Sequence, residues 1–109
     1  MTVKNFAQSA ANSTSAGSHQ TPPAIMAAGD AAFAAATTIL AAPTAPNTMA
    51  VSSGWTLTSP STSNNTTEQI RLGVAMHPGV TAPVTNAAIF TANNSAADGG
   101  WCGISAVVG

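Results

Sequence analysis

Apolar and polar residues alternate with a period of two in several segments of this chain. The clearest is the stretch EQIRLGVAMHP at residues 68–78, which lies between an Asn-Asn pair and a Pro-Gly pair. Such alternation bounded by turn residues is typical of a β-strand that buries one face. We expect its large apolar residues to be the buried ones: Ile70, Leu72, Val74 and Met76.

Two further segments show the same period. In GWTLTSP (residues 54–60), Trp55 and Leu57 point one way, and Gly54 and Pro60 punctuate the run. In the last segment, GGWCGISAVVG, an apolar set containing Cys102 and Ile104 lies opposite the set that contains Trp101. We expect the set with Ile104 to be buried and Cys102 to be a small buried apolar residue.

The alanine-rich segment 31–42 is ambiguous. Its alanines favour a helix, and Asp30 is a good helix-capping residue. Its Thr37-Thr38-Ile39 run is β-branched and favours a strand. Because the other periodic segments are all β, we interpret this segment as a strand.

These segments together predict a single all-β domain. About six to eight short strands separated by turn signals are typical of an antiparallel β-sandwich, of the jelly-roll or immunoglobulin-like kind. Residues 1–20 are expected to form an extended N-terminal arm or an edge strand, and residues 21–109 the sandwich core. A tryptophan buries roughly 150–250 Å², so Trp55 is the expected anchor of an otherwise alanine-rich core. The predicted core anchors are Trp55, Leu57, Ile70, Leu72, Val74 and Ile104.

The charge content is very low. Only 5% of the residues are charged, with two basic and three acidic side chains, against about 25% in an ordinary domain. Two cations cannot neutralise a run of phosphates, which argues against nucleic-acid binding. No run of about 18 apolar residues predicts a membrane span. A nearly neutral, polar surface favours association with other proteins.

No catalytic, cofactor or metal motif is present, so we do not expect an enzyme. His19 and His77 are far apart in the sequence, no zinc-ligand spacing occurs, and Cys102 is the only cysteine. Arg71 is predicted to point outward and serve as an interface contact, with an ordinary exposed arginine as the alternative. Trp101 is predicted to be either an exposed contact or partly buried.

The order of several motifs resembles a β-sandwich module that recurs in structural proteins of tailed bacteriophages and related prophages. The segments that carry the resemblance are Ala28-Gly29-Asp30, Gly54-Trp55-Thr56-Leu57, residues 68–85 and the closing strand. The chain departs from the pattern in its alanine-rich strand and its lack of tyrosine.

This resemblance implies a virion protein, namely a capsid decoration or cement protein. Its implied partners are the major capsid protein or other virion subunits, with several copies assembled on the particle. The alternative is a receptor- or carbohydrate-binding adhesion module of a phage fibre, in which an exposed Trp101 would contact sugars.

Overall fold

The computed structural model contains eleven β-strands and no helix in the part of the chain that it describes. All strand pairings are antiparallel, and the strands form three sheets. This confirms an all-β, sandwich-like fold. The described residues are 1–9, 17–41, 48–58, 61–64, 68–93 and 97–109.

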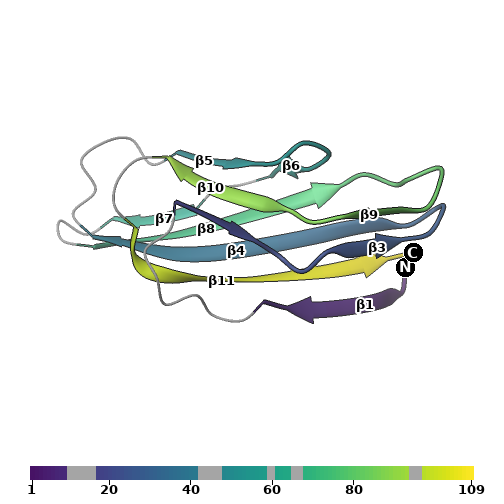
Figure 1. Cartoon of the computed structure of the whole chain (residues 1–109), viewed down its shortest axis with the longest axis horizontal. Helices are drawn as coiled ribbons and strands as arrows, with labels where there is room; N and C mark the ends of the chain where they lie inside the picture. The colour runs from purple at the N-terminus through teal and green to yellow at the C-terminus, as the bar shows by residue number, and fades with distance from the viewer. Residues whose placement is uncertain (10–16, 42–47, 59–60, 65–67, 94–96) are drawn as a thin grey trace.

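The largest sheet has six strands (Figure 1). Three long neighbouring strands form its centre: β11 (Ala97–Val108), β4 (Ala31–Ala41) and β8 (Glu68–His77). The remaining three strands lie outside them: β1 (Val3–Gln8) pairs with β11, whereas β6 (Thr56–Leu57) and β7 (Ser61–Asn64) pair with β8.

Two smaller sheets supply the second layer. One contains β2 (Ser18–Gln20), β10 (Ile89–Asn93) and β5 (Thr48–Val51). The other contains β3 (Ala24–Met26) and β9 (Val84–Asn86). Four of these five strands have only three or four residues, and such short strands explain why there are more strands than the sequence pattern predicts.

The alanine-rich segment forms β4, a strand between β11 and β8. The prediction of a strand over residues 31–42 is therefore confirmed as far as Ala41, and Ala42 lies outside the described residues. β8 pairs with β4 continuously from Ala32 to Ala41, and β11 pairs with it along most of its length. This tertiary context overrides the helix propensity of alanine.

The hydrophobic core lies between the six-stranded sheet and the two smaller sheets. Trp55 belongs to it, as predicted, and only 6% of its surface is exposed. Gly54 precedes it at a φ of 89°, a left-handed conformation that favours glycine. Leu57 is partly buried and packs against the same core. The fully buried apolar side chains with the largest volumes in this core are Trp101, Phe90, Met26 and Val107.

The predicted faces of β8 and β11 are wrong. The period of two is present, but the covered face of β8 carries Arg71, Gly73, Ala75 and His77. Ile70 and Leu72 are 51% and 41% exposed, and Ile104 on β11 is 38% exposed. Val74 is half-buried on the same outer face. Four of the six predicted core anchors therefore lie outside the core.

Small residues on the covered face explain this reversal. A Cβ built on Gly73 would collide with Sδ of Met49 and lie 2.9 Å from the Phe90 ring. On β11, a Cβ on Gly103 would lie 3.1 Å from Thr21 of the second layer. The second layer thus places Met49 and Phe90 over the sheet, and β8 and β4 make room for them with glycine and alanine. On the same sheet, β11 contributes Trp101 and Val107 to the core.

The two chain ends meet at one end of the sheet (Figure 1). Thr2 and Gly109 exchange two backbone hydrogen bonds of 3.0 Å, and β1 forms an edge strand next to β11. The Lys4 ammonium lies 2.6 Å from the buried Asp30 carboxylate. The hydrogen bond from Lys4, followed by one from the Ala27 amide, lowers the pKa of Asp30. This pair holds the N-terminal strand to the turn before β4.

Candidate functional site

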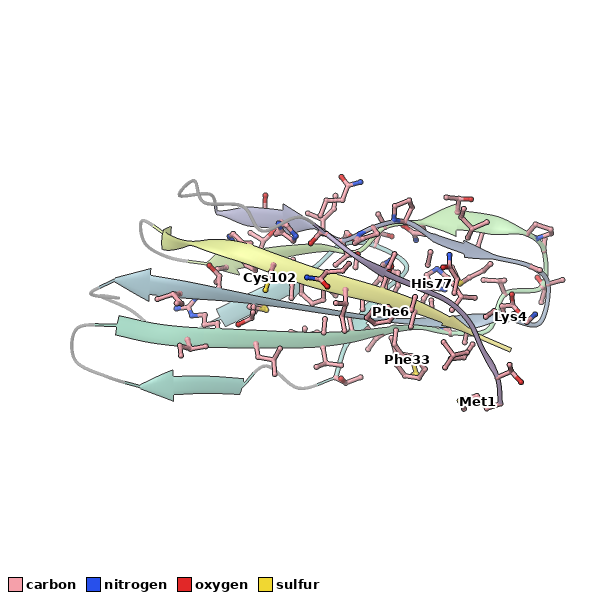
Figure 2. The ribbon with its side chains drawn as sticks, turned by 90° about the horizontal axis from the view of Figure 1, so that it is seen from below. Met1, Lys4, Phe6, Phe33, His77 and Cys102 are labelled. Atoms are coloured by element: carbon pink, nitrogen blue, oxygen red, sulfur yellow. The ribbon has the colours of Figure 1, made fainter. Side chains whose placement is uncertain are left out.

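The outer face of the six-stranded sheet is apolar and is not covered by the smaller sheets. Figure 2 shows β11, β4 and β8 side by side, with Phe6, Phe33 and Cys102 labelled. The antiparallel register aligns residues of one face into rows across the strands. One row runs from β1 to β8 through Phe6, Ala106, Phe33 and Met76. The next rows contain Gln8, Ile104, Ala35 and Val74, then Cys102, Thr37 and Leu72, then Ile39 and Ile70.

We call these residues the outer apolar face. Seven of its large side chains are 37–60% exposed: Phe6, Phe33, Ile39, Ile70, Leu72, Met76 and Ile104. A fully exposed large apolar side chain has an accessible area of about 150–250 Å², so these seven together expose on the order of 500 Å². Patches of about 300–600 Å² are the largest that ordinary monomers show, and they are often functional.

The outer apolar face has ridges and hollows. One hollow, with a volume of about 190 Å³, lies among Ala35, Thr37, Cys102 and neighbouring residues of β4 and β11. A second, of about 180 Å³, lies beside Phe33, Val74 and Ala106. Among the described side chains of this face, none is charged. The surface can therefore pack against another apolar surface without leaving a charge unpaired.

Arg71 and Trp101, the two predicted contact residues, are both buried. Each is 1% exposed, and both side chains lie on the covered face of the sheet. Burial lowers the pKa of the Arg71 guanidinium from its ordinary value. The prediction that Arg71 points outward is wrong, for the same reason that the faces of β8 are reversed. Of the two alternatives for Trp101, exposure is wrong and burial is right, so the carbohydrate-binding alternative loses its exposed indole.

Trp101 belongs to a polar cluster where β1 ends. Its ring stacks on His19 with centroids 6.1 Å apart and planes 5° apart. Nε2 of His19 lies 2.7 Å from Oγ of Ser9. Gly103 N–H donates to the Ser9 hydroxyl at 2.9 Å, and the Ser9 N–H donates to the Gly103 carbonyl at 2.8 Å.

This cluster is built as a structural link between β1, β2 and β11. A serine–histidine nucleophile needs a third group that orients the histidine, and no carboxylate contacts His19 among the described residues. Burial lowers the pKa of His19, which favours the neutral imidazole. The Ser9 hydroxyl is already held by Gly103 and His19, so the arrangement fixes the end of β1.

The other tryptophan also contacts a histidine. Trp55 and His77 meet edge to face, with ring centroids 5.4 Å apart. The indole N–H of Trp55 has no hydrogen-bond partner among the described residues. The residue is placed by its ring contacts and by the Gly54 turn.

The described residues contain no group of three His, Cys, Asp or Glu side chains that could hold a metal ion. They contain no helix long and apolar enough to cross a membrane. Cys102 is a free, half-buried thiol on the outer apolar face, so the prediction of a fully buried position is wrong.

Comparison with known proteins gives no assignment. No family model matches this chain, and no curated protein or solved structure matches it. The resemblance to phage structural modules therefore stays a prediction from sequence motifs.

Two glycines in the sequence are the signal that could have identified the outer apolar face. Glycine inside a strand often marks a close approach of another backbone or layer. Gly73 and Gly103 both lie on the faces that carry Arg71 and Trp101. They mark the side that the second layer approaches, and the opposite side is the outer apolar face.

Proposed function

We propose that this protein is a structural subunit of a larger assembly, and that it works by packing its outer apolar face against other protein. The observation that carries the proposal is the exposed apolar surface on the six-stranded sheet, which has no charged side chain among its described residues. Exposed patches of this kind are typical of protein interaction sites.

The proposed setting is a phage particle, with this chain as a decoration or cement protein on the capsid surface. The motif order described above supports this setting, and the low charge of the chain supports a place among closely packed subunits. The partners are then the major capsid protein or other virion subunits. Many copies on a symmetric shell would multiply individually weak contacts.

The setting is tested on purified particles of the phage that encodes the chain. Quantitative mass spectrometry is expected to find this chain at a fixed ratio to the major shell protein. Gradient-purified particles without it would contradict the virion setting.

A further inference from the structure

We infer that the outer apolar face is covered by a second copy of this chain, so that two copies pair through their six-stranded sheets. This inference rests on the proposed function, because it names the first partner of the same surface. Contacts with a shell would then be made by other surfaces of the pair.

The size of the outer apolar face fits a second copy of this chain. Strands of about ten residues rise about 3.3 Å per residue and lie about 4.8 Å apart, so β1, β11, β4 and β8 cover on the order of 30 by 20 Å. A stable interface buries about 800 Å² on each partner. The large apolar side chains provide over half of this area, and half-buried residues between them, such as Ala35 and Val74, add to it.

The shape of the outer apolar face is compatible with packing against the same face of a second copy. A two-fold interface uses the same patch on both copies, so the patch must carry both projections and recesses. The exposed Leu72 and Ile70 project from β8, and the hollow beside Cys102 lies next to them across β4. Sheets that pack face to face lie about 10 Å apart and are rotated by about 30°, and their facing side chains interdigitate.

The charge of the face also favours a second copy. Interfaces between different proteins commonly use complementary charges for steering and selection, and the described part of this face has none. Among the described side chains of the face, pairing with an identical copy brings no like charges together, and the chain's net charge of -1 opposes association only weakly.

Analytical ultracentrifugation of the full chain tests the inference. Wild-type protein is expected to shift from 10.6 kDa to twice that mass as its concentration rises. Leu72→Asp places a carboxylate in the centre of the face and is expected to raise the dimer dissociation constant about 100-fold. The matched control is Ile25→Asp on β3, because Ile25 is 65% exposed but lies outside the face. It should leave the dimer constant unchanged.

The single thiol gives a second readout without any mutation. Cys102 lines the hollow of the face, so its modification rate with a maleimide is expected to fall as wild-type protein dimerises. In Leu72→Asp the rate should not depend on concentration. Circular dichroism shows whether that variant keeps its β-fold.

The outcomes separate this inference from the proposed function. A chain that stays monomeric up to its solubility limit, or a dimer with an unprotected Cys102, overturns the second-copy inference. If such a monomer is still found on particles, the proposed function stands alone. A Cys102-protected dimer that is missing from particles keeps the inference and overturns the virion setting.

Discussion

At the centre of the six-stranded sheet, the covered and outer faces differ in the size of their side chains. The covered face carries Gly73, Ala75 and a row of alanines from β4, whereas the outer face carries Phe33, Ile70 and Leu72. Phe90 and Met49 of the second layer fill the space above Gly73, and Trp101 and Val107 of β11 add to the large core residues. In a sandwich, therefore, the more apolar face of a strand is not always the buried one.

Among substitutions that leave the chain folded, the largest expected effect comes from the same Phe→Ala change made once in the core and once on the outer face. Phe90 is fully buried, so Phe90→Ala removes a core ring and should lower the free energy of unfolding by about 3–5 kcal/mol. Phe6 is 60% exposed on the outer face, and Phe6→Ala should change it by about 0.5 kcal/mol or less. Urea unfolding followed by circular dichroism, at a concentration where the chain is monomeric, measures both. Equal losses would contradict the placement of the core.

A second pair of substitutions tests the close approach of the layers. Gly73→Ala adds a methyl group against Met49 and Phe90, and such overpacking should cost about 1–3 kcal/mol. Gly79→Ala is the control, because its Cβ would meet only the Asp30 carbonyl at an ordinary 3.8 Å. The same unfolding curves measure the two variants. A Gly73→Ala protein as stable as the control would show that the second layer is not in contact there.

The placement of Gly73 on the covered face shows how much of the fold the sequence predicts. The period of two identified β8 and β11, and the chain's many β-like segments correctly placed the alanine-rich β4 in a sheet. Alternation alone does not say which face another layer covers, because that depends on long-range packing. Ile70 and Leu72 were therefore assigned to the wrong side, and Arg71 and Trp101 with them.

The sequence predicts even less of the outer apolar face than of the fold. The sequence indicates a low-charge protein suited to association, but the outer apolar face forms only when β1, β11, β4 and β8 align in register. Phe6 and Phe33 are 27 positions apart in the chain, and Phe33 and Met76 are 43 apart. Only the strand pairings bring them into one row.

A smaller effect is expected from pH. Burial against Trp101 on the covered face lowers the pKa of His19, so the unfolded chain binds a proton more readily than the folded one. The stability contributed by neutral His19 is therefore complete above its ordinary pKa of 6.5 and is lost as the pH falls from there towards the lowered folded value.

Unfolding free energies measured from about pH 8 to about pH 5, the range in which histidine titrates, test this loss of stability. His19→Gln keeps a polar side chain but cannot be protonated, and it should flatten the pH dependence. An unchanged slope in this variant would show that the imidazole is not buried in the folded protein.

The most direct test of which face is buried compares a carboxylate on each side of β8. Ala75 is fully buried and Leu72 is 41% exposed. With an unpaired charge in the core, Ala75→Asp should abolish the folded β-sheet spectrum in circular dichroism. Leu72→Asp should keep that spectrum and a cooperative unfolding transition in dilute solution. A folded Ala75→Asp protein together with an unfolded Leu72→Asp protein would contradict the account.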